Sequence, residues 1–306
     1  MDTMSAFKEM LPYVREFQGK LFVVKVGGEV CEPDRLDEIA RQLSLIHHIG
    51  MNVVLVHGGG PQMNSMLETL GVERKMIAGR RITDDTTLEV AKMVYKGLVG
   101  TNIVSALARQ GARAVGLSGV DAGIIRASKR PKQLLEDDSG KVVEVDFGHV
   151  GDITEIDPSV LHALIEKRII PVVCALGGGA NGEVFNINAD TISSRIAQTL
   201  KAEKYIVLTN VAGVLEDVSN PQSLVSYADV DTLSVLIEKG AIKGGMRPKV
   251  EACIDAIRNG VHRTHIIDGT RDEALLIELF KNEGCGTMIV DRKEKLSQDA
   301  IQGGKK

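Results

Sequence analysis

Apolar runs that end in glycine alternate with amphipathic segments along the chain. Residues 20–26 and 51–60 each contain such a run, which is the pattern of a buried strand followed by a tight turn. Segments 34–49 and 61–71 follow them and carry apolar residues at helical spacing. Parallel strands joined by crossover helices produce this order, so the N-terminal third predicts a parallel sheet covered by helices.

The same alternation continues to residue 290. We expect further strands at 113–118, 169–176, 204–210, 263–268 and 286–290. We expect helices at 84–110, 157–168, 189–201, 230–239, 245–259 and 272–282. Thr83 is the expected N-cap of the first of these helices, and Asp34 that of the earlier helix at 34–49. Residues 123–151 predict short β-hairpins. The fold class is therefore an α/β three-layer αβα sandwich with a mainly parallel central sheet.

Composition excludes several classes of function. The net charge is −4 without a basic block, and aromatic residues make up only 3% of the chain with no Trp, so we expect no nucleic-acid partner. The four cysteines are far apart and form no CxxC pair, which favours reduced thiols and a cytoplasmic protein. The N-terminal residues do not resemble a signal peptide, and the apolar runs stay below about 18 residues, so we expect no membrane span.

Three glycine-rich segments follow predicted strands, at 24–29, 56–61 and 176–182. Glycine lets backbone N–H groups approach an anion closely, and a helix N-terminus behind the loop adds its dipole. The segment HGGGP fits best because Pro61 begins a helix directly after the glycines. The alternative is that all three are simple tight turns. The third segment formally matches GxGxxG, but an extended stretch follows it, and the chain contains no GxxxxGK[ST] motif.

Charged residues stand beside these turns. Lys25 lies within an apolar strand, where burial of its ammonium group requires an anionic partner, unless the strand is at the sheet edge and Lys25 faces solvent. Lys249 lies near the start of a helix, where a cation opposes the helix dipole unless an anion binds there; a solvated surface lysine is the alternative. Asp190 or Asn188 begins the helix at 189–201, and an N-cap is the simplest role for Asp190.

Polar groups suited to an amino-acid ligand lie in the same regions. Asn186 and Asn188 alternate around Ile187 in an extended stretch, so their amides share one face. Arg81 precedes a predicted helix and could bind a carboxylate with two hydrogen bonds, or could be an ordinary surface arginine. In a doubly wound sheet, strand ends and helix starts converge on one crevice, so we expect these residues to meet.

These motifs resemble the amino-acid kinase family over residues 20–290. KVGG, VHGGGPQ, GRRIT, GLSG-D, FNINAD, LTNVAGVL and GGMRPKVEA occur in family order. The combination of HGGGP, NINAD and GGM-x-PK resembles the branch that phosphorylates N-acetyl-L-glutamate. The resemblance implies a carbamate kinase-like fold and an ATP-dependent reaction on the side-chain carboxylate of N-acetyl-L-glutamate, an early step of arginine biosynthesis. It also implies Mg²⁺ bound mainly through the nucleotide phosphates, without protein metal ligands.

The resemblance also implies residue roles and a division of the chain. Catalysis is implied for Lys25, Lys249 and Asp190. Acyl-substrate binding is implied for Gly59, Gly60, Arg81, Asn186 and Asn188. Nucleotide binding is implied for Gly27, Gly28, Gly58, Thr209, Asn210, Gly213 and Leu215. The whole chain is expected to be one domain, with an oligomerisation helix at 1–18, an acyl-substrate lobe at about 19–182, a nucleotide lobe at about 183–292 and a polar tail at 293–306.

The N-terminal segment indicates regulation. Phe7, Met10, Leu11, Val14 and Phe17 have helical spacing, and Pro12 is expected to kink or restart the helix. This segment resembles the interlacing helix of arginine-inhibited hexamers in the family; packing on its own subunit is the alternative. The resemblance implies a homohexamer or homodimer, L-arginine as an inhibitor near Glu278, and a PII-type regulator as a further partner. Asp272 and Glu273 are more acidic than the family pattern, and Val120 replaces a lysine.

Two other functions stay open at this level. The first is a sibling kinase that acts on another carboxylate, such as aspartate or a carrier-bound aminoadipate. The second is a catalytically silent amino-acid sensor, which loss of Lys25, Asp190 or Lys249 would favour; all three residues are present.

Overall fold

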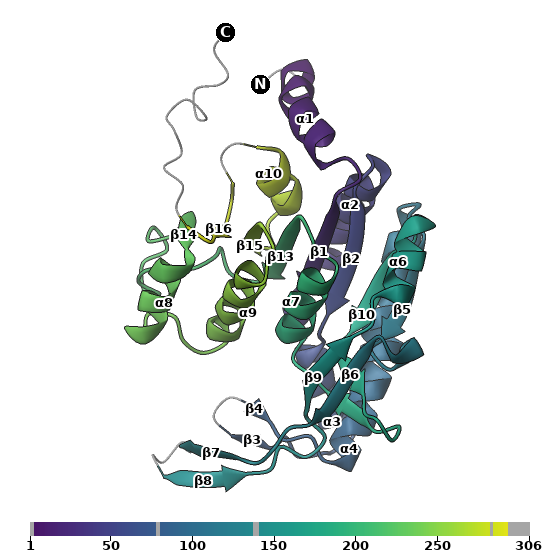
Figure 1. Cartoon of the computed structure of the whole chain (residues 1–306), viewed down its shortest axis with the longest axis vertical. Coiled ribbons are helices and arrows are strands. Elements are labelled where there is room, and N and C mark those ends of the chain that lie inside the picture. The colour runs from purple at the N-terminus through teal and green to yellow at the C-terminus, as the bar shows by residue number, and fades with distance from the viewer. Residues whose placement is uncertain (1–2, 78–79, 137–140, 282–283, 293–306) are drawn as a thin grey trace.

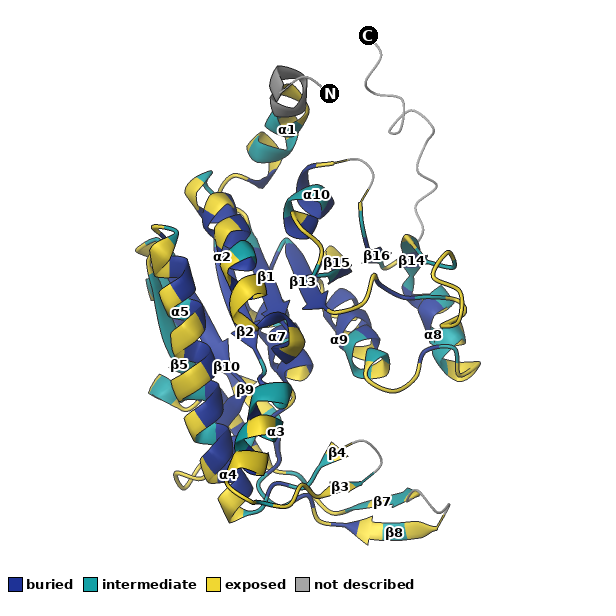
Figure 2. Ribbon diagram, turned by 180° about the vertical axis from the view of Figure 1, so that it is seen from behind, coloured by how far each residue is buried: buried dark blue, intermediate teal, exposed yellow. Residues whose placement is uncertain are grey.

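A central sheet with helices on both faces forms the body of the protein (Figure 1). The computed structural model describes residues 3–77, 80–136, 141–281 and 284–292, without the side chains of 3–7. Within these residues the sheet order is β14-β16-β15-β13-β1-β2-β10-β5. β16 runs antiparallel to β15, and the other neighbours pair in parallel. Helices α2 and α5 cover one face, and α7 and α9 cover the other (Figures 1 and 2). The prediction of a mainly parallel three-layer sandwich is confirmed.

The strands of this sheet follow the apolar runs of the sequence. They are β1 (Leu21–Val26), β2 (Asn52–His57), β5 (Ala114–Ser118), β10 (Ile170–Cys174), β13 (Lys204–Thr209), β14 (Tyr227–Asp229), β15 (Arg263–Asp268) and β16 (Thr287–Val290). Strands β1, β2, β10 and β13 are almost fully buried, because both faces of the sheet are covered there. The short strand β14 was not predicted, since three residues carry too little pattern.

The helices agree with the predicted segments within a few residues in most places. They are α1 (Thr3–Phe17), α2 (Pro33–His48), α3 (Gly60–Thr69), α4 (Asp85–Lys92), α5 (Gly100–Arg109), α6 (Ser159–Glu166), α7 (Ala189–Thr199), α8 (Val230–Glu238), α9 (Met246–Arg258) and α10 (Ala274–Phe280). Short 3₁₀ turns are η1 (Gly28–Val30) and η3 (Asp121–Gly123). Helix α2 begins at Pro33 with Glu32 as its N-cap residue, so the assignment of Asp34 as the cap is wrong. Pro needs no N–H donor at this first position.

The predicted helix at 84–110 is not one regular α-helix. Between α4 and α5 lies η2 (Met93–Val99), a π-helical segment. A π-helical segment changes the phase of the side chains that follow it, but the apolar spacing of the sequence alone does not reveal it. The cap of α4 is Asp84, whose Oδ1 accepts the Thr87 N–H at 3.0 Å, so Thr83 is not the cap. Thr83 instead pairs its backbone with 147–149 and is fully buried.

A smaller layer of strands lies at one end of the sheet (Figure 1). One four-stranded sheet has the order β12-β11-β6-β9, and two hairpins pair β3 with β4 and β7 with β8. The bounds are β3 (Met76–Ile77), β4 (Arg80–Arg81), β6 (Ile125–Lys129), β7 (Gln133–Glu136), β8 (Val142–Val145), β9 (Gly151–Ile156), β11 (Leu176–Gly178) and β12 (Val184–Asn186). The hairpins expected in 123–151 are therefore present, and they lie on the side of the molecule that holds the candidate site.

Helix α1 projects from the opposite end (Figure 2). It runs continuously through Pro12, so the proline neither ends nor restarts it. Its last residue Phe17 is buried against Phe22 of β1, with ring centroids 5.4 Å apart. The predicted polar tail at 293–306 lies outside the described residues. None of the helices in the described part combines the length and hydropathy that a membrane span requires.

Candidate active site

Ten of the fifteen predicted site residues line one cavity of about 650 Å³. It lies where the C-terminal ends of β1 and β2 meet the N-termini of α3, α7 and α9. The cavity is lined by the predicted residues Lys25, Gly28, Gly58, Gly59, Gly60, Arg81, Asn186, Asn188, Asp190 and Lys249. Helix N-termini carry unpaired N–H groups and the positive end of the helix dipole. Three of them around one cavity suit it to anionic ligands.

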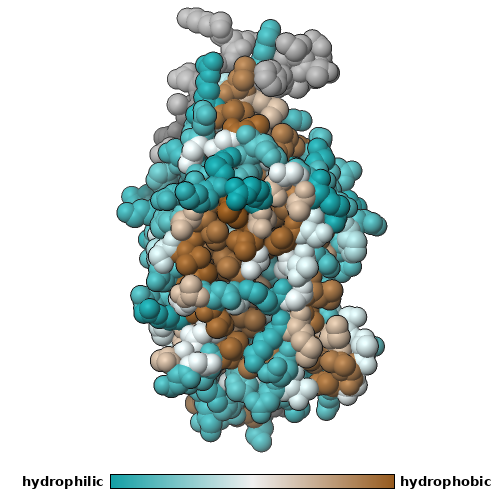
Figure 3. Space-filling view, turned by 90° about the vertical axis from the view of Figure 1, so that its right-hand side faces the viewer, coloured by the Kyte–Doolittle hydropathy of each residue, from teal (hydrophilic) through white to brown (hydrophobic). Residues whose placement is uncertain are grey.

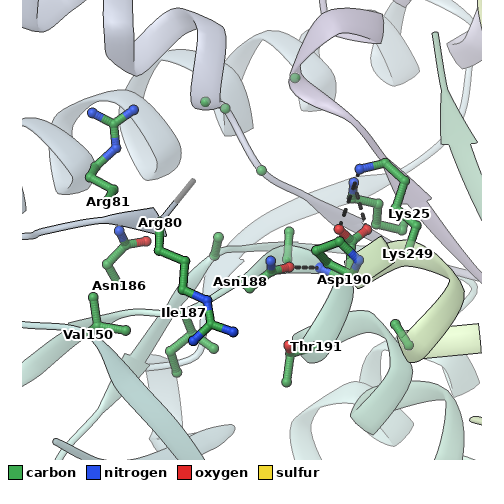
Figure 4. A pocket seen from close by; sticks show the side chains of 18 of the residues that line it. Lys25, Arg80, Arg81, Val150, Asn186, Ile187, Asn188, Asp190, Thr191 and Lys249 are labelled. Atoms are coloured by element: carbon green, nitrogen blue, oxygen red, sulfur yellow. Dashed lines mark hydrogen bonds and ion pairs between the residues drawn. The ribbon is translucent and has the colours of Figure 1, made fainter. Parts of the chain in front are cut away.

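Lys25, Asp190 and Lys249 form a buried ionic cluster at one end of the cavity (Figure 4). Lys25 Nζ lies 2.8 Å from Asp190 Oδ1, and Lys249 Nζ lies 3.6 Å from Asp190 Oδ2. Strand β1 is central, between β2 and β13, and Lys25 is only 5% exposed, so the edge-strand interpretation is wrong. The two cations face the cavity with one carboxylate between them. Such a cluster keeps a surplus positive charge for a negatively charged ligand.

The local structure of α7 leaves Asp190 available to the lysines. Asn188 is the N-cap of this helix, and its side-chain Oδ1 accepts the Asp190 N–H at 2.7 Å. The sequence left the cap open between the two residues, and the structure assigns it to Asn188. Burial alone would raise the pKa of Asp190, but the charges of Lys25 and Lys249 outweigh burial and hold this pKa below its ordinary value. Asp190 is therefore ionised at neutral pH.

The second lysine has a different environment. Lys249 belongs to the first turns of α9, and its Nζ also donates to the Gly245 carbonyl at 3.2 Å. Burial, and after it the charge of Lys25, lower the pKa of Lys249, whereas Asp190 opposes this shift. A phosphate group that binds between the two lysines would relieve their mutual repulsion. The cluster can therefore hold an anionic group such as a phosphate between the two lysines.

The glycine loops form the wall of the cavity between its two ends. A Cβ on Gly28 would lie 2.6 Å from Pro61 Cδ, and a Cβ on Gly59 would lie 2.9 Å from Tyr95 Cδ1. Glycine is therefore required by close packing at both positions. Gly59 is the N-cap residue of α3, and its neighbours leave the helix N-terminus open to the cavity. The close packing confirms the tight turns at both glycines, whereas the anion-binding interpretation stays a prediction with which the open helix N-terminus is compatible.

Arg81 lies at the other end of the cavity (Figure 4). Its Nη2 donates to Asn64 Oδ1 of α3. Its Nη1 is buried and has no hydrogen-bond partner among the described residues. Burial lowers the pKa of Arg81, but an arginine keeps its charge at neutral pH. An unpaired buried guanidinium N–H group is costly unless a ligand supplies an acceptor, so this end of the cavity suits a carboxylate.

The two asparagines occupy the floor between these ends (Figure 4). Asn186 Nδ2 donates to the buried Thr83 Oγ1 at 3.1 Å, which fixes the orientation of the amide. Asn188 caps α7, as described above. Both line the cavity, as the alternating pattern predicted.

Several predicted nucleotide-binding residues do not line this cavity. Gly27 donates its N–H to the Leu208 carbonyl at 3.1 Å, so this amide is already used. Thr209 ends β13 and is buried, and Asn210 follows it at the surface. Gly213 has φ +150°, and a Cβ there would lie 2.6 Å from Thr287 Oγ1. Leu215 pairs with Leu224 in an isolated bridge. Asn210, Gly213 and Leu215 belong to the segment that follows β13, whereas Gly27 belongs to the turn after β1.

Sequence reasoning missed three side chains at the Arg81 end of the cavity: Tyr95, Arg80 and Arg130. Tyr95 lies in η2 and donates its hydroxyl hydrogen bond to Met63 Sδ at 3.1 Å. It has the apolar spacing of an ordinary core position, so no signal distinguished it. Arg80 stood beside Arg81 in GRRIT and was a detectable second cation. Arg130 pairs with Asp152 at 2.6 Å.

Metal coordination by side chains has little support in this region. In the described part of the chain, no three His, Cys, Asp or Glu side chains gather as a metal-binding set. Asp190 is committed to two lysines. A divalent ion that enters this cavity with a nucleotide would therefore find its oxygen ligands mainly on the phosphates.

Comparisons with known proteins show what the chain is similar to. Residues 20–268 match the amino acid kinase family. The chain is 44% identical over 283 residues to an acetylglutamate kinase from Heliobacterium modesticaldum, a match that covers 92% of this chain and 96% of that protein. A solved N-acetylglutamate synthase from Neisseria gonorrhoeae, complexed with coenzyme A and N-acetyl-glutamate, superposes with a TM-score of 0.82 at 26% identity. The match covers 96% of this chain but 65% of the synthase. Carbamate kinase from Giardia lamblia, bound to AMP-PNP, has a TM-score of 0.60 at 20% identity, with coverage of 89% and 98%.

Proposed function

The chain belongs to the amino acid kinase family, and within it to the acetylglutamate kinases, and from this premise we propose that it phosphorylates N-acetyl-L-glutamate with ATP. The acceptor is the side-chain carboxylate, and the product is N-acetyl-L-glutamyl 5-phosphate, an early intermediate of arginine biosynthesis. The observation that carries this proposal is the buried Lys25–Asp190–Lys249 cluster, which faces Arg81 across one cavity.

The reaction needs alignment and charge neutralisation rather than a base. A carboxylate is already ionised at neutral pH, so its oxygen can attack the γ-phosphorus directly. The new bond joins this oxygen to the γ-phosphorus, and the bond from that phosphorus to the β–γ bridging oxygen breaks, so ADP leaves with the electron pair. Lys25 and Lys249 stabilise the negative charge of the phosphoryl group during transfer, and Asp190 holds both lysines in position.

The two substrates occupy opposite parts of the cavity in this proposal. Arg81 binds the α-carboxylate, the amides of Asn186 and Asn188 contact the rest of the acyl substrate, and the N–H groups of Gly59 and Gly60 face the reacting carboxylate. On the other side, Gly28 and Gly58 border the phosphates, together with Gly27 as part of the turn. The residues Thr209, Asn210, Gly213 and Leu215 border the adenosine.

A Mg²⁺ ion bound with ATP would take its oxygen ligands mainly from the phosphates and would neutralise part of their negative charge. The chain's own residues do the rest: the glycine loops and helix N-termini hold the phosphates, and the lysines meet the transferred group. The free state of all four cysteines supports a cytoplasmic enzyme.

The proposed lobes share one sheet. The acyl-substrate lobe, about 19–182, contributes β2 on one side of β1, and the nucleotide lobe, about 183–292, contributes β13 on the other. The ionic cluster uses both, since Lys25 belongs to the first lobe and Asp190 and Lys249 belong to the second. Relative motion of the lobes would therefore change the spacing of the catalytic groups.

Arginine inhibition is a further part of the proposal. Lys204, His265 and Glu278 form a buried polar chain beneath the end of α1, with Lys204 Nζ 3.3 Å from His265 Nε2 and His265 Nδ1 2.7 Å from Glu278 Oε1. Lys204 also lies 5.1 Å from the centre of the Phe17 ring. We propose that L-arginine binds beside this junction of α1 and α10, where charged groups already meet the N-terminal helix.

The acidic residues that departed from the family pattern have partners in α2. Asp272 accepts a hydrogen bond from Arg35 at 3.2 Å, and Glu273 Oε1 lies 3.8 Å from Arg41 Nη2. These exposed pairs neutralise the extra acid at the start of α10. They support the view that the departure alters the surface rather than the proposed arginine site.

Oligomerisation is proposed at two surfaces. Strand β5 is at the edge of the sheet, and most of its residues are only half-buried. Figure 3 shows apolar side chains gathered on this side of the molecule. An exposed strand edge beside an apolar surface favours pairing with a second copy, so a homodimer is proposed there. The projecting helix α1, with half-buried Met10, Leu11 and Val14, is proposed to join dimers into a homohexamer, on which a PII-type regulator could dock.

The first test is ATP-dependent acyl-phosphate formation, trapped with hydroxylamine. The substrates are N-acetyl-L-glutamate, L-glutamate, L-aspartate and a blank, each with and without L-arginine. A signal with N-acetyl-L-glutamate that arginine suppresses supports both parts of the proposal. A signal with another carboxylate alone would reassign the protein to a sibling kinase. No signal with any of them from folded protein, together with arginine binding, would favour a silent sensor.

Replacement of Arg81 is expected to act on substrate binding. Arg81→Gln removes the buried guanidinium that we assign to the α-carboxylate, so KM for N-acetyl-L-glutamate should rise roughly 100-fold with a smaller change in kcat. Steady-state kinetics measure this, and Arg126→Gln, which removes a surface arginine paired with Glu155, is the matched control. An unchanged KM in the Arg81 variant would remove Arg81 from the substrate site.

Replacement of Lys204 is expected to stabilise the fold at neutral pH. Burial, and after it the charge of Arg263, lower the pKa of Lys204 to about 8, below its ordinary value of 10.5. The folded state therefore disfavours the charged lysine; this cost is complete below pH 8 and disappears as pH rises through 10.5. Lys204→Met should raise the free energy of unfolding by about 3 kcal/mol at pH 7 and by much less at pH 10.5.

Urea denaturation at both pH values measures this difference. The exposed Lys239→Met is the control, and it should change the free energy of unfolding by less than about 0.5 kcal/mol at either pH. A Lys204 variant that is less stable than the parent at pH 7 would contradict the prediction. It would mean that the chain from Lys204 to Glu278 stabilises the fold.

A further inference from the structure

A second arginine enters the cavity beside Arg81. Arg80 and Arg81 are neighbours on β4 and leave it in opposite directions, and both line the cavity (Figure 4). Arg81 is partly buried against α3, whereas Arg80 is exposed and its side chain extends away from that of Arg81 in Figure 4. The Arg80 Nη1 donates to Gln133 Oε1 of β7 at 3.0 Å. A neighbouring hairpin therefore holds this cation at the mouth of the cavity.

The charges that line the cavity are segregated. The acidic residues Glu29, Asp190, Glu251 and Asp255 lie at the end with Lys25 and Lys249, on or beside the helices of the ionic cluster. At the Arg81 end the charged lining residues are Arg80, Arg81 and Arg130. The guanidinium group of Arg130 donates two hydrogen bonds to the Asp152 carboxylate, which neutralises its charge. Within the described residues, this end therefore has two cations, Arg80 and Arg81, without a carboxylate partner.

This arrangement has a consequence for the α-nitrogen of the substrate. A free amino acid carries an ammonium group beside its α-carboxylate, and two nearby cations without a carboxylate would repel it. An N-acylated amino acid has a neutral amide there, and its carbonyl oxygen can accept a hydrogen bond from a guanidinium group. One guanidinium group, that of Arg81, is sufficient to bind the α-carboxylate. Arg80 can therefore interact with the acyl group on the α-nitrogen.

We infer that Arg80 is a specificity-determining residue, which donates to the acyl carbonyl of the substrate and excludes free amino acids by charge. This inference rests on the proposed function and assigns the α-nitrogen end of the same site. Gln133 is a positioning residue, because it orients the Arg80 guanidinium and does not line the cavity. A site that excludes competitors through an unfavourable contact needs no tighter binding of its own substrate.

The test compares kcat/KM for N-acetyl-L-glutamate and L-glutamate in the full-length protein. Arg80→Gln should lower kcat/KM for N-acetyl-L-glutamate about 10-fold and raise it for L-glutamate, so that their ratio falls about 100-fold. Arg80→Lys keeps the charge without the planar fork and should still exclude L-glutamate. Gln133→Leu should lower the ratio by less than Arg80→Gln. Arg258→Gln removes an exposed arginine of α9 outside the cavity lining and should leave the ratio unchanged.

The outcomes separate this inference from the proposed function. If the parent protein phosphorylates N-acetyl-L-glutamate and Arg80→Gln lowers both kcat/KM values in parallel, Arg80 has only a structural role and the inference fails alone. The same holds if Arg80→Gln leaves the ratio at the parent value. If the parent protein does not phosphorylate N-acetyl-L-glutamate, the proposed function itself fails.

Discussion

Lys25→Met is expected to lower kcat about 1000-fold while KM for N-acetyl-L-glutamate changes little. Lys25 lies at the phosphoryl end of the cavity, 2.8 Å from Asp190 and away from Arg81, so it meets the substrate mainly where charge moves in the transition state. Removal of one preorganised donor to a developing charge costs about 100- to 1000-fold in comparable sites. The rest of the site would still bind the acyl substrate, which is why the effect falls on kcat.

Steady-state and single-turnover kinetics measure this change. Lys20→Met is the matched control, because Lys20 stands just before the same strand but is exposed and paired with Glu203 at the surface. Its kcat should stay within a factor of two of the parent value. If Lys25→Met instead raised KM and kept kcat, Lys25 would be a binding residue. The proposal that it stabilises the phosphoryl group during transfer would then be wrong.

The fold could be predicted because its signals are local. Each of β1 and β2 is an apolar run ended by glycine, and each following helix has apolar spacing and a proline in its first turn. The break of 84–110 by η2 could not be predicted, since a π-helical segment uses the same helix-forming residues as a regular helix. Asp84 rather than Thr83 caps α4 because of a tertiary hydrogen bond: the Thr83 hydroxyl already accepts from the Asn186 side chain.

The candidate site was predictable only as a set. Whether Lys25 faces solvent or an anion depends on the order of strands, and this order joins β1 to β13 across about 180 residues of sequence. The choice between Asn188 and Asp190 as N-cap likewise depends on distant residues, because Lys25 and Lys249 form ion pairs with the Asp190 carboxylate. Tyr95 was missed because its contact with Met63 comes from a distant part of the chain. Arg80 was detectable as a cation beside Arg81, but its contact with Gln133 could not be predicted.

Asp190→Asn is expected to destabilise the protein and to inactivate it. The substitution keeps the shape of the side chain but removes the negative charge between two buried lysines, and removal of one partner of a buried ionic cluster costs about 3–5 kcal/mol. The pKa of Asp190 is below its ordinary value in the folded state, so this stabilisation is present above about pH 4 and is lost as pH falls through the folded pKa. The parent and the variant should therefore converge in stability in strong acid.

Urea denaturation across pH, with turnover at pH 7, measures both effects. Asp37→Asn is the control, since Asp37 pairs with Arg109 at the surface and should change stability by less than about 1 kcal/mol. The double variant Asp190→Asn, Lys249→Met separates electrostatics from shape. Removal of one lysine relieves the repulsion between the two cations, so the double variant should recover part of the lost stability without recovering turnover. A double variant that is less stable than Asp190→Asn would contradict this. It would show that Asp190 stabilises the fold by packing, rather than by offsetting the repulsion between Lys25 and Lys249.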